Sequence, residues 1–95
     1  MEIVEKSIND LKVYDKNARI HPPKQIDLLK KNIERFGFTT PILIDENNNI
    51  IAGHGRLTAI KELEWQKVPC VLISGLTEEE IKALRLADNQ LAAMA

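Results

Sequence analysis

The feature that most constrains this chain is a short apolar run that ends in a glycine-rich turn, within Ile50–Leu57. Residues 50–52 are apolar, Gly53 and Gly55 flank a histidine, and Arg56 begins a helical pattern. A helix start carries unpaired backbone N–H groups, and the helix dipole favours an anion there. Glycines let a ligand approach the backbone, and an arginine adds a rigid fork of donors. The stretch predicts either a phosphate-binding turn or an ordinary strand-to-helix turn.

Composition indicates a single globular domain, because the chain has 95 residues, 44% of them hydrophobic and 28% charged. The net charge of -1 gives no overall attraction to DNA or anionic lipid, so a nucleic acid would be reached through a local patch or a further domain. Cys70 is the only cysteine, which excludes an internal disulfide and a cysteine cluster for zinc. With no signal peptide and no run of membrane-spanning length, we expect a cytoplasmic protein without a membrane partner.

The pattern of apolar residues predicts a small α+β domain with one mixed sheet and about three helices. Strands are expected near residues 3–8, at 41–44, at 50–52 and at 68–73, with 45–49 as the turn of a hairpin. Helices are expected over residues 24–36, from 56 to about 64, and from the capping box at 77–80 onward.

Several single residues sharpen these expectations. The first helix presents an apolar face that ends at Phe36, and Gly37 is placed to cap it. Pro69 places its strand's start near a sheet edge or a strand beginning, and Cys70 is expected in the core. The third helix is predicted to run past Asp88 with no capping signal at its end, so we expect residues 1–95 to be the N-terminal domain of a longer protein.

The motifs together resemble the ParB/sulfiredoxin-like superfamily, whose members include the ParB-like nuclease domain. The form found in phages and mobile elements, at the N-terminus of DNA methyltransferases, is the most similar, because it shares the Ala-Gly-His-Gly-Arg spelling and the Leu-Ala-Asp-Asn-Gln ending. The resemblance implies the ParB/sulfiredoxin-like fold over nearly the whole chain. The matching blocks lie at residues 17–19, 33–38, 41–44, 51–56, 68–71 and 86–90.

The resemblance also implies a nucleotide pocket, because ParB proteins hold CTP and Mg²⁺ at the corresponding blocks. His54 and Gly55 depart from the family's Gly-Glu-Arg-Arg phosphate motif, and His54 replaces the reactive cysteine of sulfiredoxins, so sulfiredoxin chemistry is not expected. Asp88 is the implied metal ligand, and His54 is the candidate catalytic residue. The implied phosphate- and nucleotide-binding residues are Gly53, His54, Gly55, Arg56, Arg19, Asn17, Thr39, Thr40 and Asn89.

Three functions remain open at this point. The first is a module that binds a nucleotide (CTP or ATP, with Mg²⁺) or phosphate and serves DNA modification or DNA partitioning, reaching DNA indirectly or through a further domain. The second is an enzyme, either a metal-dependent nuclease or a CTPase-like nucleotide hydrolase that uses His54 with a metal at Asp88. The third is a non-catalytic protein-interaction domain. Homodimerisation is open in each case.

Overall fold

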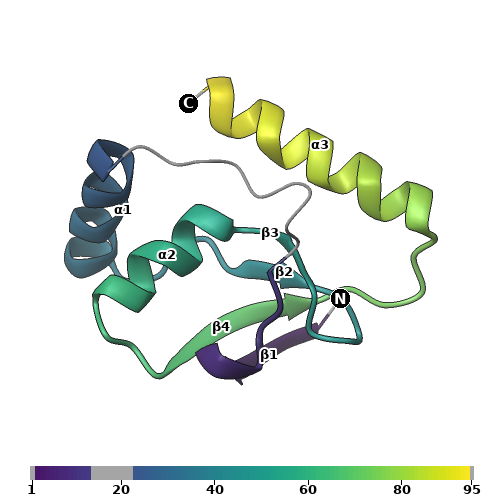
Figure 1. The fold of residues 1–95 in the computed structure, drawn as a ribbon, viewed down its shortest axis with the longest axis horizontal. Helices are drawn as coiled ribbons and strands as arrows, with labels where there is room; N and C mark the ends of the chain where they lie inside the picture. The colour runs from purple at the N-terminus through teal and green to yellow at the C-terminus, as the bar shows by residue number, and fades with distance from the viewer. Residues whose placement is uncertain (1, 14–22, 95) are drawn as a thin grey trace.

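The computed structural model describes residues 2–13 and 23–94 of the chain, and the side chains of these residues as far as residue 87. Figure 1 shows a sheet with helices on it, which confirms the α+β class and the predicted order of elements. Within these residues the elements are β1 (Glu2–Ser7), the 3-10 turn η1 (Ile8–Asp10), α1 (Pro23–Phe36), β2 (Ile42–Ile44), β3 (Ile50–Ala52), α2 (His54–Glu62), β4 (Lys67–Leu72) and α3 (Glu78–Met94).

The four strands form one mixed sheet in the order β1-β4-β2-β3, so β1 and β3 are its two margins. Strand β4 pairs antiparallel with β1 and parallel with β2, whereas β2 and β3 form the predicted antiparallel hairpin. The register shifts between Leu43 and Ile44, because β3 contains one residue more than β2 at this point. This bulge interrupts the usual alternation, and all three residues of β3 are buried.

The turn of the hairpin is closed by its aspartate, as the run of Asp and Asn residues predicts. Asp45 Oδ1 accepts hydrogen bonds from the backbone N–H groups of Asn47 at 2.8 Å and Asn49 at 2.9 Å. Asn48 adopts the left-handed conformation with φ 65°, which asparagine tolerates better than most residues.

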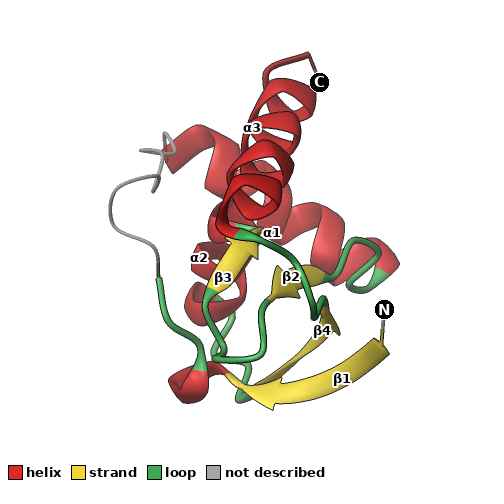
Figure 2. Cartoon of the chain, turned by 90° about the vertical axis from the view of Figure 1, so that its right-hand side faces the viewer, coloured by secondary structure: helices red, strands yellow, loops and turns green. Residues whose placement is uncertain are grey.

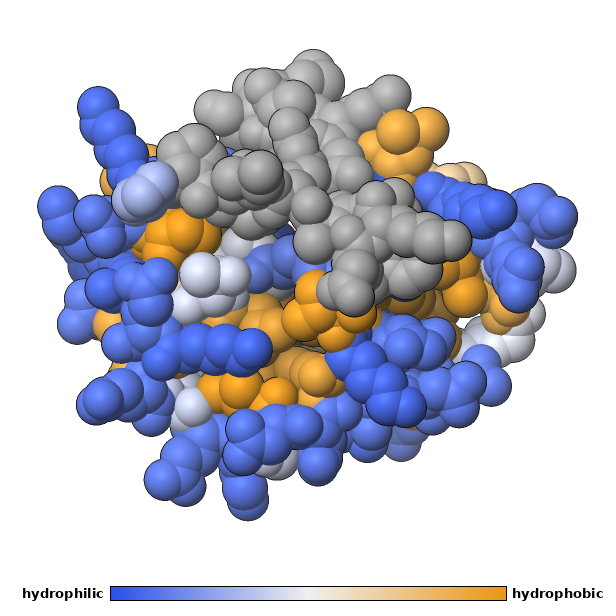
Figure 3. Space-filling view, in the orientation of Figure 1, coloured by the Kyte–Doolittle hydropathy of each residue, from blue (hydrophilic) through white to orange (hydrophobic). Residues whose placement is uncertain are grey.

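The core lies between the sheet and the helices α1 and α2, which pack against each other. On the face shown in Figure 3, apolar side chains gather near the centre, and hydrophilic side chains lie to their left, right and below. An ion pair of 3.3 Å between Lys30 and Glu62 joins the two helices at the surface. The buried cluster consists of Ile8, Ile26, Ile33, Ile42, Ile44, Ile50, Leu57, Ala59, Ile60, Val68 and Cys70.

Two predictions about single positions need correction. Phe36 does not extend the buried face of α1: its side chain is 64% exposed, and its ring lies 5.1 Å from the Arg35 guanidinium. Its helical position is at the margin of the stripe centred on Ile26 and Ile33, so it reaches past the contact with α2. Pro69 is not on an edge strand, because β4 lies between β1 and β2. It is the third residue of β4, which begins at Lys67, and pairing with β2 starts at the next residue, Cys70.

The predicted end of α1 at Phe36 and the predicted run of α3 past Asp88 are confirmed. Gly37 takes φ 81° and donates its N–H to the Ile33 carbonyl at 2.9 Å, as a left-handed cap does.

Helix α3 packs against the margin strand β3, away from β1 (Figure 2). Across residues 2–13 and 23–94, none of the helices is long and apolar enough to cross a membrane.

Candidate functional site

The predicted phosphate turn joins β3 to α2 through a single left-handed residue. Gly53 has φ 111° and ψ 23°, and its carbonyl accepts the first helical hydrogen bond, from the Leu57 N–H at 2.9 Å. The amides of residues 54–56 therefore precede the hydrogen-bond ladder of α2. The helix begins at His54 rather than at Arg56, because one left-handed residue is enough to redirect the chain and Gly55 is already helical. It also ends at Glu62, two residues earlier than predicted.

The residues packed around Gly53 leave little room for a Cβ atom at this position. A Cβ atom built there would lie 3.0 Å from Ile42 Cγ1 and 3.2 Å from Arg56 Nη2. Gly53 is buried, so the space that a side chain would need is filled by β2 and by the arginine of the same turn. The positive φ disfavours other residues independently of this contact.

Arg56 ties the turn to the loop that precedes β2. Its Nη2 donates a hydrogen bond of 3.2 Å to the Pro41 carbonyl, and the residue is half-buried. Since Thr39 and Thr40 immediately precede Pro41, the structure brings the two threonines to the same side of the molecule as the turn. Both threonines are exposed. This bond holds the guanidinium beside the turn and links α2 to the loop that precedes β2.

His54 is the first residue of α2 and is half-buried. Its carbonyl accepts a hydrogen bond from Thr58 Oγ1 at 3.1 Å, within the helix. His54 lies at the helix start, where the dipole favours negative charge. Its role as a phosphate ligand, or as an acid or base near neutral pH, stays a prediction.

Four other predicted site residues lie outside the side chains that the structure describes. Asn17 and Arg19 are outside the described residues. Asp88 and Asn89 belong to α3, about one turn beyond Arg85, but the description of side chains ends before them. Among the described side chains, no three His, Cys, Asp or Glu residues gather in a way that could hold a metal ion. The magnesium ligand therefore stays a prediction.

Cys70 is confirmed as a core residue. Its side chain is fully buried, and burial raises the pKa of the thiol, an effect that nearby Lys6 partly opposes. A buried thiol with a raised pKa is a poor nucleophile.

Arg85 is a buried charged residue that the sequence interpretation did not single out. It is 7% exposed, and its Nη2 donates a hydrogen bond of 3.0 Å to the Ile50 carbonyl, which attaches α3 to the margin strand β3. The helical period of the sequence could have indicated this burial, because Arg85 follows Ile81 by four residues and so lies on the same face of the helix.

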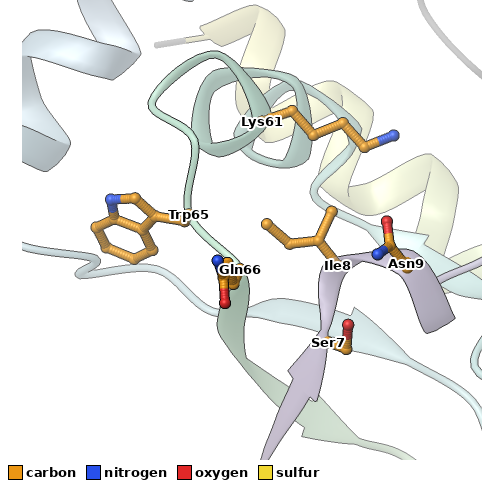
Figure 4. A pocket seen from close by; sticks show the side chains of 6 residues that line it. All are labelled: Ser7, Ile8, Asn9, Lys61, Trp65 and Gln66. Atoms are coloured by element: carbon orange, nitrogen blue, oxygen red, sulfur yellow. The ribbon is translucent and has the colours of Figure 1, made fainter.

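Two hollows lie away from the turn. One, of about 370 Å³, lies beneath α3 and is lined by Asp45, Asn49, Glu78, Ile81, Lys82 and Arg85. The other, of about 440 Å³, lies where α2 ends and β1 turns into η1, and is lined by Ser7, Ile8, Asn9, Lys61, Trp65 and Gln66. Figure 4 shows the Trp65 indole and the Lys61 ammonium directed to opposite sides of the second hollow. Because its largest apolar and charged groups diverge, this hollow lacks the convergence of a ligand site.

Sequence comparison finds relatives that match most of this chain. The ParB-like nuclease domain-containing protein YnaK of Escherichia coli K12 is 44% identical over 80 residues, which cover 84% of this chain and 92% of YnaK. The nucleoid occlusion protein of Lysinibacillus sphaericus is 31% identical over 74 residues. Those residues are 74% of this chain but only 24% of that relative.

Solved structures share the fold. A C-terminally truncated chromosome-partitioning protein ParB of Caulobacter crescentus, complexed with CTP-γ-S, superposes with a TM-score of 0.80 at 21% identity. The match covers 94% of this chain and 53% of that one. Sulfiredoxin of Arabidopsis thaliana superposes with a TM-score of 0.73 at 21% identity, over 88% of this chain and 97% of the sulfiredoxin. The predicted ParB/sulfiredoxin-like fold is confirmed.

The model of the ParB N-terminal domain family matches residues 2–90, which is nearly the whole chain. The three helices and the mixed sheet of the described residues agree with the structural similarity to ParB and sulfiredoxin. The chain therefore belongs to the ParB N-terminal domain family.

Proposed function

We propose that this domain binds a nucleotide, with the phosphates at the turn formed by Gly53–Arg56, and that it serves a system that partitions or modifies DNA. The observation that carries the proposal is the start of α2. Its N-cap is a glycine, no acidic residue occupies the first turn, and the Arg56 guanidinium lies against that glycine. A helix start of this kind favours a bound anion through its dipole and its amides.

CTP is the first nucleotide to test, because a ParB of the same fold was crystallised with CTP-γ-S. Thr39 and Thr40 would add hydroxyl groups beside the turn. Asn17, Arg19 and Asn89 would complete the pocket, and Asp88 would hold Mg²⁺ together with the phosphates. Magnesium is suited to this arrangement, because it is commonly bound by one or two carboxylates plus the phosphates of a substrate.

Within this proposal, the finer version is a domain that works beside a DNA methyltransferase of a phage or mobile element. The Ala-Gly-His-Gly-Arg spelling of residues 52–56 favours it. The nucleoid occlusion relatives favour the partitioning version instead. In either version, contact with DNA is indirect or made by a further domain.

Calorimetry with CTP, ATP and GTP, each with Mg²⁺, tests the proposal. We expect binding of CTP, and a loss of about tenfold or more in affinity for Arg56→Ala, since hydrogen bonds to charged groups contribute roughly 1.5–3 kcal/mol. Arg35→Ala is the matched control, because Arg35 is exposed on α1 and contacts only the neighbouring Phe36 ring among the interactions described for it. Absence of binding to all three nucleotides, or an Arg56→Ala variant equal to wild type, would refute the proposal.

A metal-dependent nuclease is the second candidate, favoured by the nuclease domain in the name of YnaK. His54 would then act as acid or base near neutral pH. Incubation of supercoiled plasmid with the protein and Mg²⁺ or Mn²⁺ tests this activity. Nicking that disappears in His54→Ala but persists in Arg35→Ala would support a nuclease, and intact plasmid would refute it.

A further inference from the structure

The margin strand β1 offers a regular, open edge for another strand. All six of its residues, Glu2–Ser7, pair with β4 on the inner side, without a bulge, a glycine or a proline. No further strand follows β1 in the described sheet, and Figure 2 shows β1 as its outermost strand. Such an edge presents free backbone donors and acceptors and can be extended by a second strand.

An exposed isoleucine lies on this strand. Ile3 is 79% exposed, the largest exposed fraction among the large hydrophobic residues described. It pairs across the sheet with Val71, and Val71 pairs with Leu43, so an apolar row crosses three strands and ends at the open margin. Neither a proline nor a bulge protects the margin at this point, although both are common devices of edge strands.

A second copy of β1 fits this edge in one register better than in the others. Two antiparallel copies related by a two-fold axis must pair about a residue, because opposite residues have to share a face of the sheet. Pairing about Glu5 would set the two Glu5 carboxylates opposite each other. Pairing about Ile3 would use only residues 2–4 of the described strand.

Pairing about Val4 avoids both problems. It uses residues 2–6 and sets Glu2 opposite Lys6 of the second copy, twice, because of the two-fold symmetry. Opposite charges in such cross-strand pairs are stabilising. The Ile3 side chain would lie against the aliphatic part of Glu5 in the second copy, and the two Ile3 residues would be diagonal neighbours, about 7–8 Å apart.

We propose that two copies of this chain associate through β1, in the register centred on Val4, to form one continuous sheet. The proposal is independent of nucleotide binding, because β1 and the turn at Gly53 lie on different elements and β1 does not pair with β3. It names a second copy as the partner because the charges of the strand complement themselves in this register.

Sedimentation equilibrium over concentrations from about 10 μM to about 1 mM tests the proposal, a range suited to a contact through a single strand. We expect a monomer–dimer equilibrium. Lys6→Glu should weaken it by about tenfold, because two attractive pairs become repulsive. The double variant Glu2→Lys/Lys6→Glu should restore it, because it exchanges the charges and recreates both pairs. Lys31→Glu, an equal change of charge on the exposed surface of α1, should have no effect.

Hydrogen exchange gives a second measurement on the same samples. Outward-facing amides of β1 should gain protection with concentration in the wild type and in the double variant, whereas Lys6→Glu should need about tenfold higher concentrations for the same gain. A wild type that stays monomeric over the whole range, or a dimer that Lys6→Glu leaves unchanged, would overturn the proposal. Circular dichroism confirms that each variant is folded before it is measured.

Discussion

The starts of helices α2 and α3 solve the same physical problem in different ways. At α3, Thr77 Oγ1 accepts a hydrogen bond from the Glu80 N–H at 3.2 Å, and Glu80 Oε1 accepts one from the Thr77 N–H at 3.0 Å. Three glutamates occupy its first turn, which suits the positive end of the helix dipole. At α2, the N-cap is Gly53, which has no side chain, and the first turn contains no acidic residue.

The difference indicates which start is suited to an external anion. The chain supplies its own oxygen atoms and negative charge to α3, so an anion from solution would meet glutamates there. At α2 the N-cap is a glycine, the first turn holds no acidic residue and the Arg56 guanidinium lies beside the glycine, so the charge at this start suits the anion that we propose. The contrast leads to three predictions, given from the largest expected effect to the smallest.

Gly53→Ala tests whether the start of α2 depends on its backbone. We expect a loss of about 2–4 kcal/mol in the free energy of unfolding, from the left-handed conformation and from overpacking against Ile42. Gly75→Ala is the matched control: it has φ 78°, but an added Cβ would meet no other atom within 4 Å, so only about 1–2 kcal/mol should be lost. Urea denaturation measures both values. Equal losses would show that packing at Gly53 is unimportant.

Thr77→Ala tests the start of α3, which is capped by its own side chains. Removal of the cap should cost about 1 kcal/mol in the free energy of unfolding, because the Glu80 N–H loses its acceptor. Nucleotide affinity measured by calorimetry should not change, since the ligand is proposed to bind at the other helix. A Thr77→Ser variant, which keeps the hydroxyl, should retain most of the stability. A fall in nucleotide affinity for Thr77→Ala would contradict the division between the two helix starts.

Inorganic phosphate, the smallest of the probes, tests the start of α2. At a phosphate concentration equal to its dissociation constant, binding should add about 0.4 kcal/mol to the free energy of unfolding. Thermal unfolding at constant ionic strength, with chloride as the comparison salt, measures this gain. Arg56→Ala should lose the gain and Thr77→Ala should keep it. Equal gains in both variants would place phosphate elsewhere on the protein.

Local features of the chain were predictable because their causes are local. The capping box at residues 77–80, the left-handed cap at Gly37 and the hairpin turn closed by Asp45 each depend on residues a few positions apart. The strands and helices followed from apolar periodicity for the same reason. The bounds of α2 were less certain, because a glycine can belong either to a turn or to the first turn of a helix.

Features that depend on distant segments were not predictable in the same way. The interior place of β4 follows from its parallel pairing with β2, and residues 42 and 70 are far apart in the chain. The burial of Arg85 requires the Ile50 carbonyl, 35 residues away. The exposure of Phe36 follows from where the contact between α1 and α2 ends.

The sequence by itself determined the class of the fold, the elements and the family, because these follow from periodicity, turn chemistry and the order of motifs. It also placed glycines and an arginine at the start of a helix. Only the tertiary structure decided that Gly53 is packed against Ile42, that Arg56 reaches the Pro41 carbonyl, and that β1 is an edge strand of the described sheet. These properties arise from contacts between segments distant in the chain, and no local pattern encodes which segments will meet.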